Sequence, residues 1–191
     1  MTAEITVATS DNDLEQILDL QRKNLSENIT QEIAANQGFV TVKHTLDLLR
    51  KMNALTPQTI AKAGTALVGY ALVMTKQFRA DIPVLEPMFT KLAHIAFDGK
   101  AISKYDFYVM GQICIDGAHR GTGIFDALYS GQRKQLAGRY ELCVTEVAAR
   151  NIRSLKAHQR VGFRSVLEYP APNGETWHVL VWDWRDTPTS A

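Results

Sequence analysis

The chain has 191 residues, 46% of them hydrophobic and 21% charged, and its 21 Lys and Arg residues nearly balance 20 Asp and Glu residues, to a formal net charge of +1. This length and composition predict one globular domain over residues 1–191, and the balanced charge gives no general attraction to nucleic acid or to an anionic membrane. The two cysteines suggest no disulfide framework, and no apolar run predicts a signal peptide or a membrane span. We therefore expect a cytoplasmic protein; its oligomeric state stays open, a homodimer included.

The N-terminal part is expected to be one short strand followed mainly by helices. Residues 4–8 fit a strand, and Ser10 with Asp13 three positions later is typical of a helix start. Apolar residues at helical spacing follow this start. A short polar helix is expected after Thr30, and a longer helix is expected after Thr45.

A hairpin and a long insertion come next. Apolar runs on either side of Gly64 predict two antiparallel strands, and the second, Leu67–Met74, is apolar enough to lie in the middle of a sheet. Residues 77–105 are too long for an ordinary connection. Their apolar spacing predicts an inserted helix over about 83–96, which we expect to shape one side of a pocket.

The C-terminal half alternates strands and helices and ends in a hairpin. The predicted elements are a strand over 105–116, a helix that stops at Gly138, a strand over 140–148, a helix from Asn151 to Gly162, and a final strand pair over 163–170 and 176–184. Several hairpins among the helices predict a mixed α/β (α+β) fold with a partly antiparallel sheet.

The turn between the strand and the first of these helices, Arg-Gly-Thr-Gly-Ile at 120–124, has the composition of an anion site. Glycines let an anion approach the main chain, and the first turn of a helix offers unpaired N–H groups at the positive end of its dipole. Two familiar phosphate motifs are excluded: a dinucleotide fingerprint needs a third glycine where Asp126 stands, and a P-loop needs a Gly-Lys-Ser/Thr ending. Plain turn chemistry is the alternative at this point.

A second group of polar residues surrounds the last predicted helix. At about 100° per residue, Asn151, Ser154 and His158 fall within roughly 60° of one another on one helix face. Glu146 lies near the end of the preceding strand. A carboxylate at a strand end and an imidazole on the next helix can converge for proton transfer. A solvated Glu146 and a packed His158 are the alternatives.

The region of about residues 65–184 resembles the acetyl-CoA-binding core of the GCN5-related N-acetyltransferase (GNAT) superfamily. The resemblance is carried, in chain order, by the strand, the Arg-Gly-x-Gly-Ile turn, the helix, the Glu-Val strand and the segment Asn-x-x-Ser-Leu-x-x-His-x-x-x-Gly-Phe. The resemblance implies a mostly antiparallel central sheet flanked by helices, with central strands that splay apart. It implies acetyl-CoA as cosubstrate, with the pyrophosphate on the turn residues Arg120, Gly121, Thr122, Gly123, Ile124 and Phe125. Pantetheine would pair with Ile113, Cys114 and Ile115, and the groove would be completed by Asn151 and Ser154.

The catalytic residues follow from the same resemblance. Many relatives have a tyrosine four residues before the Gly-Phe pair that protonates the departing thiolate, and His158 stands at that position. Relatives that acetylate protein N-termini have a glutamate base five residues before the Asn, and Glu146 matches it. The chain departs from the family's usual residues at Ala118 and Phe125, which affects the fit of the phosphate turn but leaves its backbone donors in place.

The implied function is transfer of the acetyl group of acetyl-CoA to an amine of a small molecule or peptide. The alternatives are a non-catalytic acyl-CoA sensor or scaffold, an acyltransferase that uses a different acyl-CoA, and an unrelated phosphate-binding module. The segments expected to choose the acceptor, residues 10–60 and 77–105, carry no readable motif.

Several residues with reactive side chains are expected to be structural. Cys114 lies in an apolar strand and is expected to be a small buried side chain. Asp116 and His119 are expected to stabilise the loop, and Glu86 is expected on a solvated helix face. The five histidines are far apart and form no zinc motif, so no metal site is expected.

Overall fold

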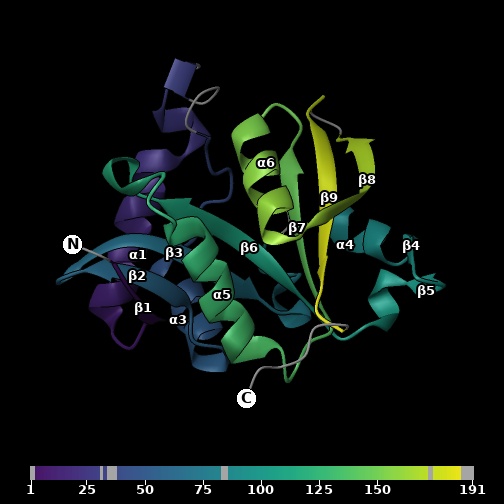
Figure 1. Cartoon of the computed structure of the whole chain (residues 1–191), viewed down its shortest axis with the longest axis horizontal. Helices are drawn as coiled ribbons and strands as arrows, with labels where there is room; N and C mark the ends of the chain where they lie inside the picture. The colour runs from purple at the N-terminus through teal and green to yellow at the C-terminus, as the bar shows by residue number, and fades with distance from the viewer. Residues whose placement is uncertain (1–2, 31, 34–37, 83–85, 172–173, 186–191) are drawn as a thin grey trace. The chain divides into compact units, whose positions relative to one another are not determined.

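The computed structural model describes residues 3–30, 32–33, 38–82, 86–171 and 174–185. The chain forms two compact units: unit 1 comprises Met1–Met74 and Met110–Gln135, and unit 2 comprises Thr75–Val109 and Leu136–Ala191. Figure 1 labels the helices and strands of both units.

The strands bear out the predicted fold class. The main sheet consists of β1 (Glu4–Val7), β2 (Thr59–Ala63), β3 (Ala66–Met74), β6 (Phe107–Ile115), β7 (Leu142–Ala148), β8 (Arg164–Pro170) and β9 (Thr176–Asp183). Its seven strands are hydrogen-bonded in the order β1-β2-β3-β6-β7-β9-β8. The pairs β1–β2, β2–β3, β7–β9 and β8–β9 are antiparallel, and β6–β7 is parallel. The fold is therefore mixed α/β with a mostly antiparallel sheet flanked by helices.

The first helices of unit 1 begin at the residues that the sequence indicates. In α1 (Asp11–Asn24), Ser10 Oγ accepts from Asp13 N at 3.2 Å and Asp13 Oδ2 accepts from Ser10 N at 3.2 Å, which is a capping box. In α3 (Leu46–Leu55), the Thr45 side chain accepts from the backbone of the first turn. The polar helix predicted after Thr30 falls largely on residues 31 and 34–37, which lie outside the described residues.

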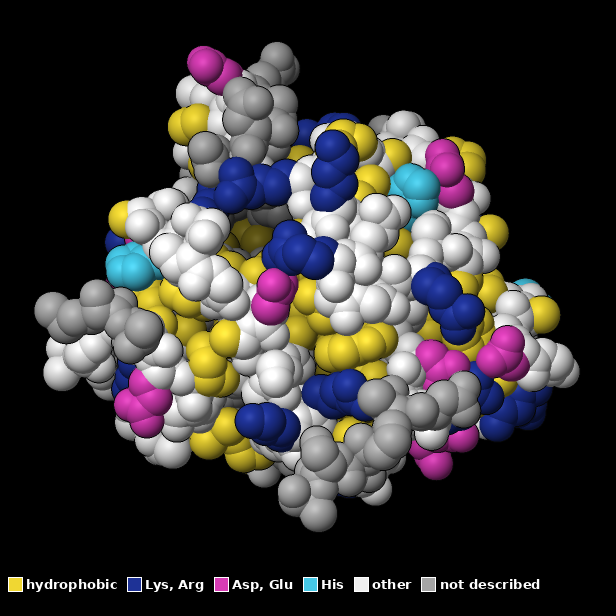
Figure 2. Space-filling model, in the orientation of Figure 1, with side chains coloured by type: hydrophobic (Ala, Val, Ile, Leu, Met, Phe, Trp, Pro, Cys, Tyr) yellow, Lys and Arg dark blue, Asp and Glu magenta, His cyan; other side chains and the backbone are white. Residues whose placement is uncertain are grey.

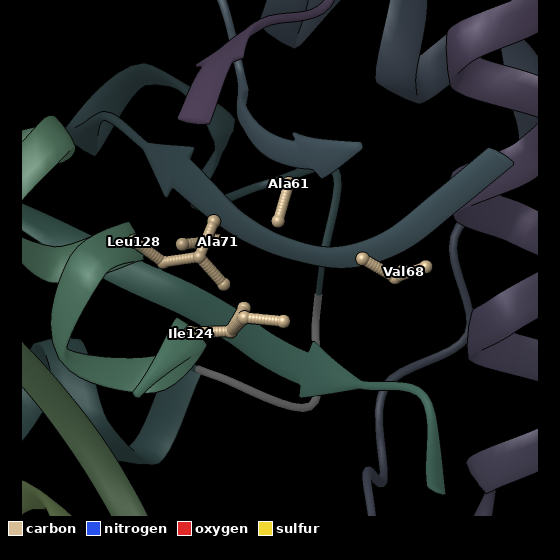
Figure 3. Close-up of a cluster of buried hydrophobic side chains, with 5 residues drawn as sticks. All are labelled: Ala61, Val68, Ala71, Ile124 and Leu128. Atoms are coloured by element: carbon tan, nitrogen blue, oxygen red, sulfur yellow. The ribbon is translucent and has the colours of Figure 1, made fainter. Parts of the chain in front are cut away.

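The core of unit 1 forms where α5 (Ile124–Leu136) packs on β2 and β3. Its buried cluster, drawn in Figure 3, comprises Ala61, Val68, Ala71, Ile124 and Leu128. Gly69 on β3 allows this close approach, because a Cβ there would meet side-chain atoms of Ile124 and Leu128 at 3.3 Å. The packing holds the first turn of α5, which follows the glycine turn directly, against the sheet.

The inserted helix of unit 2 is shorter than predicted. α4 spans Glu86–Leu92, while residues 83–85 lie outside the described part of the chain. The prediction of helix over 93–96 is wrong, because the chain turns there into the hairpin of β4 (Ala96–Phe97) and β5 (Lys100–Ala101). Asp98 and Gly99 make its turn with φ of 45° and 86°. Of the apolar residues whose spacing predicted this helix, Met88, Phe89 and Leu92 are buried on α4, Ile95 lies beyond its end, and Leu85 lies outside the described residues.

Unit 2 also contains the parallel strand pair and an aromatic core. β6 and β7 pair from Phe107↔Leu142 to Val109↔Val144, and both strands continue further. The splaying implied by the resemblance remains a prediction. Near α6 (Ile152–Val161), the ring centroids of Phe163 and Trp182 are 5.5 Å apart, and those of Trp182 and Trp184 are 5.4 Å apart, so these aromatic residues pack together.

The surface carries charges of both signs. On the face shown in Figure 2, basic and acidic side chains are interspersed with apolar and uncharged ones. Among the described helices, none is both long and apolar enough to cross a membrane. Within the described ranges, no group of three or more His, Cys, Asp or Glu side chains is placed to hold a metal ion.

Candidate functional site

The glycine turn of unit 1 presents main-chain donors at the start of α5. Gly121 and Gly123 have φ of 78° and 85°, conformations that glycine adopts without strain. The surroundings of both are open, since an added Cβ would have no neighbour within 4 Å. Among the described residues, the backbone N–H groups of Gly121, Thr122, Gly123 and Ile124 have no hydrogen-bond acceptor. The turn therefore offers a row of donors at the positive end of a helix dipole, as an anion site requires.

Side chains on the preceding loop hold this turn in place. Asp116 Oδ2 accepts from Ala118 N at 3.0 Å and lies 3.1 Å from His119 Nδ1. The hydrogen bond with His119 holds the pKa of Asp116 below its usual value. Arg120 Nη2 donates to Asn24 Oδ1 at 2.6 Å, which ties the turn to the end of α1. Asp116 and His119 thus stabilise the loop, as predicted.

The end of β6, where pantetheine is expected to pair, leads directly into this loop. Ile113 and Ile115 are half-buried against the cluster of Figure 3. Arg120 Nε donates to the Ile115 carbonyl oxygen at 3.1 Å, so the turn is also fixed to the strand. Cys114 is buried, as predicted, and burial raises the pKa of its thiol to about 12. The thiol is therefore protonated at neutral pH and is not a nucleophile.

Glu146 in unit 2 is bound by a tyrosine beside a lysine. Glu146 Oε1 accepts from Tyr169 Oη at 2.5 Å, and Lys91 Nζ, on α4, lies 4.3 Å from the centre of the Tyr169 ring. Burial raises the pKa of Glu146 to about 7, against the opposing effects of the Tyr169 hydrogen bond and the Lys91 charge. A carboxyl group that titrates near neutral pH is suited to accepting a proton from a substrate.

The sheet register explains how Tyr169 reaches Glu146. On β9, Val179 pairs with Glu146 of β7, and Trp177, two residues earlier, pairs with Tyr169 of β8. Residues two apart on a strand share a face. Glu146 and Tyr169 therefore lie on the same face of the sheet, on either side of β9, and the long tyrosine side chain spans the distance.

The sequence did not predict Tyr169 or Lys91 as site residues. The β8–β9 register contains an irregularity between Ser165 and Leu167, and a strand pattern in a sequence does not mark such a shift. The position of Tyr169 near the end of β8 therefore does not indicate, from the sequence, which residue of another strand it will contact. For Lys91, the only signal was its place on the inserted helix that was expected to shape a pocket.

Three predicted residues come together on α6. Asn151 is the N-cap and its Oδ1 accepts from Ser154 N at 3.3 Å. His158 Nδ1 lies 2.8 Å from the Ser154 carbonyl oxygen and 3.3 Å from Ser154 Oγ. The prediction that they share one helix face is confirmed, and their contact with coenzyme A stays a prediction.

His158 is enclosed by the aromatic core of unit 2. The imidazole packs edge-on against Phe163, with ring centroids 5.1 Å apart, and only 1% of the residue is exposed. Burial lowers its pKa to about 4, so the imidazole is neutral at pH 7. Any part that it takes in catalysis is therefore played by the neutral ring.

The predicted site residues divide between the units. Unit 1 holds Ile113, Cys114, Ile115, Arg120, Gly121, Thr122, Gly123, Ile124 and Phe125, and unit 2 holds Glu146, Asn151, Ser154 and His158. In unit 1, a hydrogen bond from Arg120 to Ile115 joins the turn to the end of β6. In unit 2, the α6 residues are linked to one another, whereas the contacts described for Glu146 lead to Tyr169 and Lys91.

Comparison with known proteins identifies the fold. No protein-family model matches the sequence, and no curated protein matches it. Among solved structures, yncA from Salmonella typhimurium with its cofactor acetyl-CoA has a TM-score of 0.64 at 14% identity, over 100% of this chain and 99% of that one. The NatC complex bound to Gag peptide and CoA gives 0.64 at 12% identity, over 96% and 99%. The ribosomal-protein-S18-alanine N-acetyltransferase from Escherichia coli gives 0.62 at 11% identity, over 99% and 98%. The chain thus has the fold of GNAT N-acetyltransferases, which confirms the fold that the sequence resemblance implied.

Proposed function

We propose that this protein is an acetyl-CoA-dependent N-acetyltransferase that acts on an amine of a small molecule or peptide. The observation that carries the proposal is the glycine turn. Its N–H groups at Gly121–Ile124 have no acceptor among the described residues, and they stand at the start of a helix in the fold of known acetyltransferases. A phosphate group is the ligand that such donors bind well.

In this proposal the cosubstrate is held mainly by backbone groups. The coenzyme A pyrophosphate accepts hydrogen bonds from the turn at 120–125, and pantetheine pairs along Ile113–Ile115. Asn151 and Ser154 are the further residues that contact coenzyme A in this proposal. Acetyl-CoA and CoA in similar solved structures support this choice of cosubstrate.

The reaction begins with proton transfer to Glu146. Its carboxylate takes a proton, through a water molecule, from the acceptor ammonium group. The neutral amine attacks the thioester carbon, and a backbone N–H at Ile113–Ile115 polarises the carbonyl oxygen. As the C–S bond breaks, the departing thiolate takes up the second N–H proton of the tetrahedral adduct, and Glu146 passes the proton that it accepted on to water. In the structure the neutral His158 ring carries its proton on Nδ1, toward the Ser154 carbonyl oxygen, so it donates a hydrogen bond to the sulfur only as the other tautomer, with the proton on Nε2. The products are the N-acetyl amine and free coenzyme A.

The raised pKa of Glu146 supports the interpretation that this protein is an enzyme rather than a non-catalytic acyl-CoA sensor. Because its pKa is raised from 4.5 to about 7, ionising it lowers the free energy of unfolding as the pH rises through that range. A scaffold that only binds coenzyme A gains nothing from this unfavourable group. A base that must be ionised near neutral pH accounts for it.

Two measurements test the proposal: the binding of acetyl-CoA, and then the release of coenzyme A in the presence of acceptor amines. Calorimetry should show that acetyl-CoA binds and that ATP binds much more weakly. A panel of small amines and short peptides should then release free coenzyme A from acetyl-CoA. A preference for ATP would contradict the coenzyme A site, and acetyl-CoA binding without release from any amine would indicate the sensor.

The His158→Phe substitution tests the proposed role of His158, because a phenylalanine ring can fill the same position in the aromatic core. We expect His158→Phe to lower kcat about tenfold without changing the KM for acetyl-CoA, because one hydrogen bond to a developing charge is lost. The imidazole is neutral above about pH 5, so the loss should be equal at pH 6 and pH 8. Wild-type turnover in a folded variant would restrict His158 to packing.

A further inference from the structure

The lysine beside the Glu146–Tyr169 pair places a positive charge next to the proposed base. Lys91 Nζ lies over the ring of the same tyrosine whose hydroxyl binds the Glu146 carboxylate. Its charge also lowers the pKa of Glu146. Figure 1 shows α4, which carries Lys91, beside β8, which carries Tyr169.

Lys91 has no acidic partner of its own in the part of the chain that the structure describes. The ion pairs found in unit 2 involve other cations, such as Arg79 with Glu86 on the same helix and Arg150 with Glu175. Lys91 as a residue is half-buried, and its ammonium group lies over the face of the Tyr169 ring. The carboxylate on which its charge acts is therefore Glu146, with which no salt bridge is formed.

Other charges lie further along this face of the sheet. Arg164 and Asp183 share the face of Glu146 by the register of β9, and their side chains lie 4.0 Å apart. Val179, the β9 neighbour of Glu146, is apolar. Glu168 and His178 lie 3.7 Å apart and pair with each other in the β8–β9 ladder. They alternate along their strands with Tyr169 and Val179, so they lie on the opposite face. Among the described residues, Lys91 is the cation whose charge acts on the pKa of Glu146.

We propose that Lys91 sets the acceptor class of this site: the preferred acceptor carries an anionic group, a carboxylate or a phosphate, a few bonds from the amine that is acylated. This inference rests on the proposed function and names its substrate class. An anionic group near the amine is attracted to the Lys91 ammonium, whereas a second ammonium on the acceptor is repelled by it. Diamines and polyamines are therefore poor acceptors.

The test compares acceptors that differ in the charge beside the amine. The small probes are 4-aminobutyrate, 3-aminopropyl phosphate and 1,4-diaminobutane, and the peptide probes are the amides of Ala-Glu and Ala-Lys. The readout is the ratio of kcat/KM between anionic and cationic members of each set. Loss of Lys91 also raises the pKa of Glu146 and slows every acceptor, and the ratio cancels this common effect.

We expect a ratio of about tenfold in favour of the anionic acceptors in the wild-type protein at low salt. Lys91→Met keeps the apolar stem over the ring and should bring the ratio close to one, and Lys91→Glu should invert it. Lys100→Met is the matched control, because Lys100 lies 3.8 Å over another ring, that of Tyr105. It should leave the ratio within about twofold of wild type.

The outcomes separate this inference from the proposed function. Acetyl-CoA turnover with a ratio that Lys91→Met leaves unchanged, or a wild-type preference for the cationic acceptors, overturns the inference alone. Absence of coenzyme A release from every acceptor overturns the proposed function and the inference with it. A preference for the carboxylate over the phosphate probe, or the reverse, identifies the anion and supports the inference.

Discussion

Replacing Glu146 with glutamine is expected to lower kcat/KM for the acceptor amine by about 10²–10⁴-fold at pH 6.5, the range typical of a lost general base. The KM for acetyl-CoA should not change. Glutamine retains an oxygen that can accept the hydrogen bond from Tyr169, as Oε1 does in the wild-type protein. The substitution therefore removes the proposed base while keeping the contact, and steady-state kinetics with a responsive acceptor measures the loss.

The deficit of this variant should depend on pH in a defined way. The pKa of Glu146 is about 7, so in the wild-type protein kcat/KM should rise with pH up to about 7 and then level off. In Glu146→Gln only the free amine reacts, and kcat/KM should continue to rise toward the pKa of the amine itself. The ratio of the two proteins should be constant below pH 7 and fall about tenfold per pH unit above it.

Glu168→Gln provides the control for this experiment. Glu168 is an exposed carboxylate on β8, adjacent in sequence to Tyr169 and on the opposite face of the sheet. Its replacement should leave kcat/KM within about twofold of wild type. Equal losses in both variants, or a Glu146→Gln deficit that does not vary from pH 6 to pH 9, would contradict the assignment of Glu146 as the base.

Placing a carboxylate in the glycine turn is expected to weaken acetyl-CoA binding by about 10–100-fold, at about 1.4 kcal/mol per factor of ten. Thr122 is exposed between the two glycines, so the side chain in Thr122→Glu would occupy the approach to the main-chain donors and repel a phosphate. The dissociation constant from calorimetry should rise, while kcat at saturating acetyl-CoA should change little. Moderate salt should reduce the difference by screening the repulsion.

Unfolding would not account for this loss, because a carboxylate at a helix N-terminus is favourable for the helix. The melting temperature of Thr122→Glu should therefore match or exceed that of the wild-type protein. Ser130→Glu adds the same charge at an exposed position further along α5 and should leave acetyl-CoA affinity within about twofold. Unchanged affinity in Thr122→Glu would remove the turn from coenzyme A binding.

The sequence was informative wherever structure depends on a few neighbouring residues. The pair Ser10 and Asp13 predicted the start of α1, because a capping box depends only on two residues that are three positions apart. Asn151 and Gly162 likewise bracket α6 as predicted. The glycine turn was found for the same reason, since left-handed φ values demand glycine locally.

The sequence did not predict which residues contact each other across the sheet, nor where the helix of the insertion ends. Tyr169 reaches Glu146 through a β8–β9 register that only the folded hairpin fixes. Lys91 joins them from α4, a helix whose end at Leu92 depends on the short hairpin that follows. Apolar spacing alone therefore extended the predicted helix too far, and it gave no indication of which lysine would lie beside Tyr169 and act on Glu146.

The donors of the glycine turn belong to the main chain, and this has a consequence for inheritance. A site built from backbone N–H groups requires positive φ angles at Gly121 and Gly123. It places few requirements on the neighbouring side chains beyond small size and the absence of negative charge. Neutral substitutions can accumulate around such a turn without loss of its ligand. The sequences of related proteins can thus diverge to low identity while each retains the same backbone arrangement for binding an anion.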